Sequence, residues 1–273
     1  MKTQLSVSML LCLVWLGFPA ATPAQEIMQV HKKDKTVISV PVAEIDFIDF
    51  SSSTAGEGEL LKDADGNSYK TVRIGRQLWM AENLKTTRFN NGKPIPQVTE
   101  NKAWYELKTP AYCWYNNDES ANKNPYGAIY NWYAVNTGNL CPTGWHVSSD
   151  YDWKELEEYL VANGHNSNKG KAEMIGKSLA ANYGWTPSAM PSDVGSDQLP
   201  EFRNKSGFTA LPGGFRTNNG GFSSPSGIGA YWWTSTEKNE SHAWFKHLLS
   251  FRATLEEMAQ SKYFGCSVRC VKD

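Results

Sequence analysis

The clearest hydrophobic pattern in the chain lies between Asp150 and Asn163. Its apolar residues recur at spacings of three and four, as they do on one face of a helix. Ser149 or Asp150 can accept hydrogen bonds from the first free N–H groups, and Asn163-Gly164 supplies a left-handed stop. The sequence therefore predicts a helix here, and we expect the rest of the domain to be built against it. Its apolar stripe consists of Trp153, Leu156, Tyr159 and Leu160.

The other hydrophobic patterns are shorter. A second amphipathic helix is predicted over residues 169–181, and the spacing of Ile129, Trp132 and Tyr133 favours a short helix over a buried strand at 126–135. Residues 183–230 are rich in Gly, Pro, Ser and Asn and are predicted to be mostly loop. These features indicate an α+β fold with short antiparallel strands, two helices and long loops. Strands are predicted at residues 69–74, 77–80, 111–115, 231–235, 242–250 and 265–271.

The N-terminal region has a different organisation. Residues 1–24 have the positive start, apolar centre and small-residue end of a cleaved secretory signal, and their apolar run is short for a membrane span. Residues 25–50 form a segment of their own, a β-hairpin of strands at 27–31 and 36–40 followed by an edge strand at 43–50. Residues 51–58 have the composition of a flexible linker, and the main domain covers 59–273.

Composition and charge limit the partners. Aromatic residues make up 12% of the 273 residues and charged residues only 20%, which favours a rigid, loop-rich domain over a helical bundle. The formal net charge is −1, so no basic surface for nucleic acid or for an anionic membrane is expected. After signal cleavage no integral membrane segment is expected. The chain is predicted to be secreted, at the cell surface or in the periplasm.

Four cysteines remain after signal cleavage. An even number in an exported chain indicates disulfides, and four cysteines permit three pairings. We favour Cys141 with Cys270, which would tie the predicted helix to the C-terminal strand, and then Cys113 with Cys266. The alternative is that one or more of these residues is a buried thiol that acts as a small hydrophobic side chain.

The residues for metal or cofactor chemistry are sparse. Asp63, Asp65 and Asn67 have the spacing of calcium ligands, but an EF-hand loop needs Gly at position six and Glu at position twelve. Those positions hold Ser68 and Ile74, so an Asp-Gly hairpin turn is predicted instead. The five histidines form no His-Glu-x-x-His motif, and His242 and His247 would point to opposite faces of one strand. No metal, cofactor or catalytic residue is therefore predicted.

Six runs of the main domain resemble, in order, the Fibrobacter succinogenes major paralogous domain family. The runs are DADGNSYKTVRIGRQLWMAENL (63–84), AYCWYNNDESANKNPYGAIYNWYAV (111–135), LCPTGWHVSSDYDW (140–153), SGFTALPGGFR (206–216), YWWTSTE (231–237) and GCSVRC (265–270). The resemblance implies a C-type-lectin-like fold in exported or surface proteins of Bacteroidetes and Fibrobacteres. Cys266 stands where the resemblance leads us to expect an aromatic residue. The Glu-Pro-Asn, Gln-Pro-Asp and Trp-Asn-Asp triplets of calcium-dependent lectins do not occur here, so that sugar mechanism is not implied.

The candidate ligand site lies in the long loop region. Aromatic faces and amide groups there are suited to grip a sugar ring or a protein surface. Alternatively, the two phenylalanines fix the loop to the core and the asparagines only permit turns. The candidate residues are Phe215, Arg216, Asn218, Asn219 and Phe222.

The sequence thus favours a non-catalytic recognition module that binds a glycan or an envelope protein. The second hypothesis is a structural or assembly module of the cell envelope without a small ligand. A third is an oxidase-like enzyme of the formylglycine-generating type, because Cys266 and Cys270 are spaced C-x3-C beside Arg269. Shared fold alone does not carry a reaction, and a structural role explains these cysteines more simply.

Overall fold

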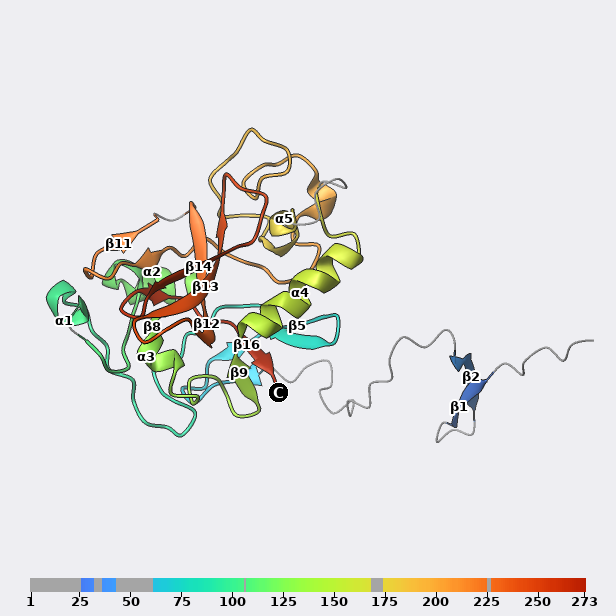
Figure 1. Ribbon diagram of the computed structural model, residues 1–273, viewed down its shortest axis with the longest axis horizontal. Helices are drawn as coiled ribbons and strands as arrows, with labels where there is room; N and C mark the ends of the chain where they lie inside the picture. The colour runs from blue at the N-terminus through green and yellow to red at the C-terminus, as the bar shows by residue number, and fades with distance from the viewer. Residues whose placement is uncertain (1–25, 32–35, 43–60, 106, 168–173, 225–226) are drawn as a thin grey trace, which may run out of the picture. The chain divides into compact units, whose positions relative to one another are not determined.

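The computed structural model describes residues 26–31, 36–42, 61–105, 107–167, 174–224 and 227–273 (Figure 1). The chain divides into two compact units, Met1–Glu57 and Gly58–Asp273. The predicted signal at 1–24, the edge strand at 43–50 and the linker at 51–58 lie outside the described residues. Within the first unit, the structure therefore describes residues 26–31 and 36–42, which contain a hairpin.

The predicted hairpin is present in the first unit. Strand β1 (Ile27–His31) pairs antiparallel with β2 (Val37–Pro41), with Ile27 opposite Pro41. Several of its apolar side chains face solvent, since Ile27 is 53% exposed and Val37 is 48% exposed. A two-stranded hairpin of this kind is marginal in water by itself, so its apolar surface needs a partner.

The second unit is α+β with antiparallel strand pairing in every named sheet. A four-stranded sheet has the order β5 (Thr71–Ile74), β6 (Gln77–Met80), β16 (Cys270–Lys272), β9 (Trp145–Val147). A three-stranded sheet consists of β12 (Gly229–Glu237), β13 (His242–Leu249) and β14 (Glu256–Ser261). A five-stranded sheet has the order β11 (Phe222–Ser223), β10 (Phe215–Arg216), β15 (Gly265–Cys266), β8 (Ile129–Asn131), β7 (Tyr112–Cys113). The small hairpin of β3 (Leu61–Lys62) and β4 (Ser68–Tyr69) completes the set.

The predicted central helix is α4 (Asp150–Ala162). A capping box fixes its start: the Asp152 N–H donates to Ser149 Oγ at 3.3 Å, and the Ser149 N–H donates to Asp152 Oδ2 at 2.7 Å. Trp153 is fully buried, with its ring 5.0 Å from that of Trp79 and 5.7 Å from that of Trp232. Tyr159 lies at the edge of the apolar stripe and is 38% exposed. Helix α4 thus buries most of the predicted face against an aromatic core.

The other helices differ from the predictions. Residues 126–135 do not form one helix, because β8 ends at Asn131 and α3 covers only Trp132–Val135. Asn131 is extended and its side chain accepts the Ala134 N–H at 3.1 Å, so it caps α3 and separates it from β8. Within the predicted helix at 169–181, residues 169–173 lie outside the described part and α5 covers only Gly176–Leu179. Helices α1 (Asn101–Tyr105) and α2 (Glu119–Tyr126) and 3-10 turns at Tyr115–Asn117 and Pro200–Phe202 were not predicted.

One predicted disulfide is present and the other is wrong. Cys141 and Cys270 are bonded, with their Cα atoms 6.0 Å apart, and join the turn before β9 to β16. Cys113 and Cys266 are separate buried thiols. Cys113 lies opposite Ile129 on one edge of β8 and Cys266 opposite Tyr130 on the other edge. Two strand spacings, about 9.5 Å, separate such positions, and neighbouring β8 residues face opposite sides, so a disulfide cannot form.

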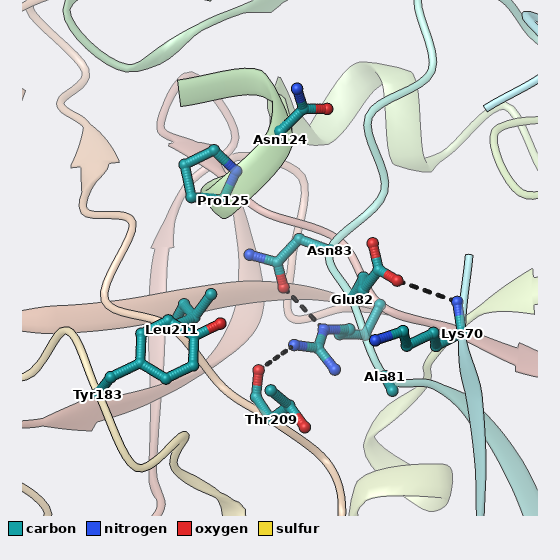
Figure 2. A pocket seen from close by; sticks show the side chains of 10 residues that line it. Lys70, Ala81, Glu82, Asn83, Asn124, Pro125, Tyr183, Thr209 and Leu211 are labelled. Carbon is teal, nitrogen blue, oxygen red and sulfur yellow. Dashed lines mark hydrogen bonds between the residues drawn. The ribbon is translucent and has the colours of Figure 1, made fainter. Parts of the chain in front are cut away.

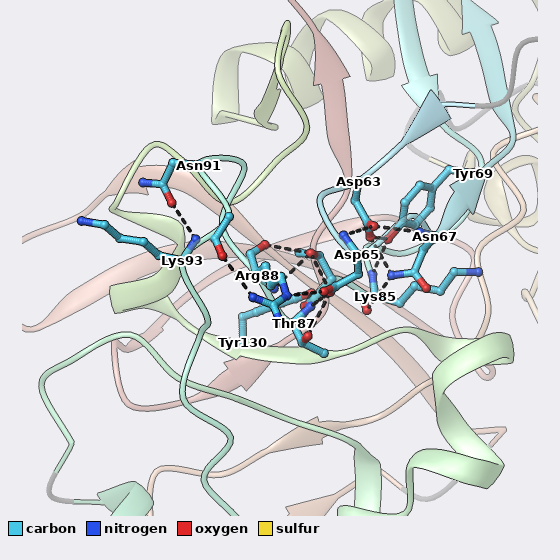
Figure 3. A network of polar contacts seen from close by, with 12 residues as sticks. Asp63, Asp65, Asn67, Tyr69, Lys85, Thr87, Arg88, Asn91, Lys93 and Tyr130 are labelled. Carbon is cyan, nitrogen blue, oxygen red and sulfur yellow. Dashed lines mark hydrogen bonds and ion pairs between the residues drawn. The ribbon is translucent and has the colours of Figure 1, made fainter.

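The Asp63 turn is a hairpin turn, as predicted, and its carboxylates are used by the protein (Figure 3). Asp63 accepts the N–H groups of Asp65 and Asn67, both at 2.9 Å, and the Tyr69 hydroxyl. Asp65 reaches across to the next loop, where it accepts from Thr87 and lies 3.1 Å from Arg88 Nε. Among the described residues, no group of three or more His, Cys, Asp or Glu side chains is placed to hold a metal ion.

Candidate functional site

Arg216, a predicted ligand residue, is instead fully buried. It donates from Nε to the Gly220 carbonyl and from Nη2 to the Thr99 carbonyl, both at 2.7 Å, and from Nη1 to the Val98 carbonyl. Its guanidinium carbon lies 4.3 Å from the centre of the Trp104 ring. Arg216 therefore holds two loops together and is not available to a ligand.

The two predicted phenylalanines also pack inward. The Phe215 ring lies 4.6 Å from that of Tyr231 and 5.7 Å from that of Phe264. Phe222 contacts the Tyr115 ring at 5.3 Å and the Arg216 guanidinium at 5.0 Å. These contacts support the alternative in which both phenylalanines fix the loop to the core.

The two predicted asparagines are exposed. Asn219 Oδ1 accepts the Gly221 N–H at 3.2 Å and the Thr217 hydroxyl, so this side chain closes the turn between β10 and β11. Asn218 faces solvent at the same turn. The structure thus separates the five predicted residues: three are buried or half-buried, and Asn218 and Asn219 remain at the surface.

A different site combines polar side chains around a hollow. A cavity of about 270 Å³, here called the Arg269 pocket, opens between segments far apart in the sequence (Figure 2). Figure 2 shows Tyr183 and Leu211 on one side, and Lys70 and Glu82 on the other. The lining residues are Lys70, Ala81, Glu82, Asn83, Asn124, Pro125, Tyr183, Thr209, Leu211 and Arg269.

Arg269 makes the floor of this pocket. It donates from Nε to Asn83 Oδ1 at 2.7 Å, and from Nη1 to the carbonyls of Met80 at 2.9 Å and Phe208 at 2.7 Å. A fourth hydrogen bond runs from Nη2 to the Thr209 carbonyl at 3.2 Å. Burial lowers the pKa of Arg269 to about 9, which leaves the guanidinium charged at neutral pH. The floor is thus a fixed positive group.

Asn83 is held equally firmly beside Arg269. Its Oδ1 also accepts the Trp232 Nε1–H at 2.9 Å, and its Nδ2 donates to the Tyr126 carbonyl at 2.8 Å. Because each polar atom of the amide has a protein partner, its orientation is fixed. The floor therefore keeps one geometry whether or not the pocket is occupied.

The rim carries the groups that a ligand can reach. Tyr183 is 61% exposed, and Lys70 and Asn124 are exposed as well. Glu82 accepts the Lys70 N–H at 3.0 Å through Oε1 and lies 3.6 Å from Lys85 Nζ through Oε2. An aromatic face, an amine, an amide and a carboxylate thus surround a rigid floor.

Sequence reasoning missed this pocket, because its residues come from six separate segments. The C-x3-C motif beside Arg269 is the basis of the oxidase hypothesis. In the structure Cys270 is bonded to Cys141, and burial raises the pKa of the Cys266 thiol well above its usual value. The two cysteines therefore do not form a pair of reactive thiols.

Comparison with known proteins identifies the family. The family model described as Fibrobacter succinogenes major domain matches residues 72–272, and the chain therefore belongs to this family. No curated protein and no solved structure matches the chain. Within the described residues, no helix combines the length and the apolar character needed to cross a membrane. The α+β class with antiparallel sheets is established by the structure, and the C-type-lectin-like arrangement stays a prediction.

Proposed function

We propose that this member of the Fibrobacter succinogenes major domain family is an exported, non-catalytic module that binds a glycan in the Arg269 pocket. The observation that carries the proposal is the exposed ring of Tyr183 beside Lys70, Glu82 and Asn124 over a rigid polar floor. Binding sites combine apolar contact with a few convergent polar groups that fix the orientation of the ligand.

The rim groups suit the chemistry of a sugar. A sugar hydroxyl both donates and accepts, and the rim offers the donor Lys70, the acceptor Glu82 and the two-sided amide of Asn124. The apolar C–H face of a sugar ring can lie on the exposed Tyr183 ring, which is amphipathic and loses little entropy on binding. The volume of about 270 Å³ is just below the roughly 300–1,000 Å³ of sites for drug-sized ligands, so we expect one sugar ring to enter.

Recognition without catalysis is supported by the carboxylates of the pocket. Most glycosidases place two carboxyl groups on either side of the scissile bond. Among the residues that line the Arg269 pocket, Glu82 is the one carboxylate. It lies 3.6 Å from Lys85 Nζ, and no second carboxylate faces it among these lining residues.

The test is a glycan-array screen of residues 25–273, with and without calcium. We expect binding that falls at least tenfold in Tyr183→Ala and in Glu82→Gln, which is about 1.4 kcal/mol of binding free energy. Tyr151→Ala is the matched control, because Tyr151 is 73% exposed on α4 and does not line the pocket. Binding that survives both pocket substitutions but is lost in Asn218→Ala would instead place the site on the β10–β11 turn.

A second candidate function, attachment to another envelope component, is favoured by the N-terminal hairpin. Its apolar residues Ile27, Val37 and Ile38 are 53%, 48% and 43% exposed. We expect deletion of residues 25–58 to abolish retention at the cell surface while the main domain still folds and binds its glycan. Retention that persists after the deletion contradicts the attachment role.

A further inference from the structure

The charges that line the Arg269 pocket are not balanced. Two cationic side chains, Lys70 and Arg269, contribute to the lining, together with one carboxylate, Glu82. The other lining side chains are uncharged. The pocket is therefore positive at neutral pH, although the chain as a whole has a formal net charge of −1.

Arg269 carries a charge that the protein does not pair directly. Its four hydrogen-bond acceptors are one amide oxygen and three backbone carbonyls, none of which is charged. A buried charge is normally paired, because the cost of removing it from water is otherwise not offset. Arg269 is only 1% exposed, so a ligand need not touch it: in a medium of low dielectric constant its charge acts across the floor of the pocket.

Lys70 carries a charge that a ligand can touch. The residue is exposed, and Figure 2 shows its side chain directed toward the middle of the pocket. The one carboxylate of the lining is occupied elsewhere, because Glu82 Oε2 lies 3.6 Å from Lys85 Nζ and Oε1 accepts the Lys70 backbone N–H at 3.0 Å. Among the described residues, no carboxylate forms an ion pair with the Lys70 amine. An anionic group on a ligand would supply that partner.

The uncharged lining favours an acidic sugar over a small free anion. Tyr183 is 61% exposed, and with Leu211 it forms an apolar side opposite Lys70 (Figure 2). A free anion would leave this side uncovered, whereas the C–H face of a sugar ring can lie on Tyr183. In a hexuronic acid a carboxylate replaces the hydroxymethyl group with little change in size. A sulfate ester adds a whole tetrahedral group, which a cavity of about 270 Å³ accommodates less well beside one ring.

We propose that the sugar that enters the Arg269 pocket is a hexuronic acid, with its ring on Tyr183 and its carboxylate beside the Lys70 amine. This inference rests on the proposed function, since it names the class of glycan that the same site binds. The ring hydroxyls are left to Asn124 and Glu82. Glu82 can serve them although both its oxygens are engaged, because a carboxylate oxygen accepts more than one hydrogen bond.

The test compares methyl glucuronide with methyl glucoside, and methyl galacturonide with methyl galactoside, on residues 25–273. Within each pair the sugars differ only in the carboxylate that replaces the hydroxymethyl group. Binding is followed by NMR titration of the Leu211 methyl signals, because Leu211 lines the pocket. We expect at least one uronide to bind at least tenfold more tightly than its neutral counterpart. This preference should shrink at high salt, because salt screens exposed charges.

The decisive variant is Lys70→Met, which removes the exposed charge from a surface position. Uronide affinity should fall at least tenfold, whereas affinity for the neutral sugar should change less than twofold. Lys70→Arg keeps the charge and should keep the preference. Lys154→Met is the matched control, because the Lys154 side chain is 73% exposed on α4 and does not line the pocket. A preference that survives Lys70→Met overturns the inference.

The remaining outcomes separate this inference from the proposed function. Equal binding of uronides and neutral sugars, lost in Tyr183→Ala, would overturn the inference and leave glycan binding in this pocket intact. Tighter binding of glucose 6-sulfate than of both uronides would also overturn it, because the preferred anion would then not be a carboxylate. Leu211 signals that no sugar moves would contradict the proposed function and, with it, the inference.

Discussion

The regions around Arg216 and Arg269 solve the same problem with the same side chain. Both arginines are almost fully buried, at 0% and 1% exposure. Each donates to backbone carbonyls of distant loops and lies 4.3 Å from the centre of an aromatic ring, Trp104 for Arg216 and Phe208 for Arg269. A planar guanidinium with five donors can satisfy several loop carbonyls at once. In a domain with short strands, these two side chains supply hydrogen bonds between distant segments that longer strands would make between their backbones.

The two regions differ in what surrounds the carbonyls. Gly220 is buried, but Thr99 is exposed and Val98 half-buried, so water can replace Arg216 at two of these three carbonyls. The partners of Arg269 include Asn83, Met80 and Phe208, all of which are buried. Asn83 in turn accepts from Trp232 in the aromatic core. The same hydrogen bonds therefore stabilise the fold more where no water can substitute for them.

The largest effect should come from the disulfide that ties the Arg269 region covalently. Cys141 and Cys270 are separated by 129 residues. In the chain-entropy model, removing a cross-link of this span lowers the free energy of unfolding by about 5 kcal/mol. We expect this loss in the double variant Cys141→Ala/Cys270→Ala, measured by urea unfolding. A loss no larger than that of Cys113→Ala would show that hydrogen bonds alone hold this region.

Arg269→Met should follow, with a loss of about 4 kcal/mol, because four acceptors lose their bond to Arg269 and roughly 1–3 kcal/mol is at stake for each one left unsatisfied. Asn83 Oδ1 keeps the Trp232 Nε1–H, so the loss comes mainly from the three carbonyls. Arg269→Lys keeps the charge but not the planar fork, so it should recover only a small part of the stability. Urea unfolding of both variants measures the difference. Full recovery with lysine would mean that charge matters more than geometry.

Arg216→Met should cost about 2 kcal/mol, because water can reach the released Thr99 and Val98 carbonyls. Both variants replace an arginine by a methionine, so the change in side-chain size is the same. The difference in their stability therefore isolates the access of water. Thermal and urea unfolding should rank Arg269→Met below Arg216→Met in stability. The opposite rank would refute the comparison between the two regions.

The smallest effect is a pH dependence of the stability. It comes from His146 on β9, the strand that pairs with β16 next to Arg269. His146 Nε2 lies 3.1 Å from Asp152 Oδ2 and Nδ1 lies 2.7 Å from Asp273 Oδ1. The hydrogen bond with Asp152, helped by Asp273, raises the pKa of His146 to about 9. Since the folded pKa lies above the unfolded value of about 6.5, the stabilisation is complete below that pH and is lost as the pH rises through 9.

The size of this effect is limited by solvent, since the His146 side chain is 42% exposed. We expect the free energy of unfolding to fall by about 1 kcal/mol between pH 6 and pH 9.5, after allowance for screening. His146→Gln should flatten this part of the profile. Arg216→Met should leave the slope unchanged, and a slope that persists in His146→Gln would assign the titration to another group.

The parts of the fold that follow from local chemistry were predictable. The capping residue Ser149 and the stripe of Trp153, Leu156 and Leu160 lie within twelve residues of one another, and α4 forms as expected. The prediction of one helix at 126–135 was wrong. Ile129, Trp132 and Tyr133 have helical spacing, but Asn131 ends strand β8 and caps helix α3. Spacing alone cannot distinguish a short buried strand from a helix.

The parts that depend on distant partners were not predictable. Cys113 and Cys266 were paired by elimination, but β8 lies between their strands. Arg216 sits among glycines and asparagines like a ligand residue, and its true partners, Val98 and Thr99, are more than a hundred positions earlier. The Arg269 pocket was missed for the same reason. Its rim is assembled by the fold, and no segment contains enough of it to form a motif.

The position of β16 in its sheet has a consequence for how the protein reaches its native state. Strands β6 and β9 do not pair with each other, and each pairs with β16. The four-stranded sheet therefore cannot close until Val271 has met Trp79 from the opposite end of the domain. Folding rates fall as contacts become more distant in sequence, because the entropy of closing a large loop must be lost first. This domain should accordingly fold slowly, and oxidation of Cys141 and Cys270 should accelerate the last step by holding β16 beside β9.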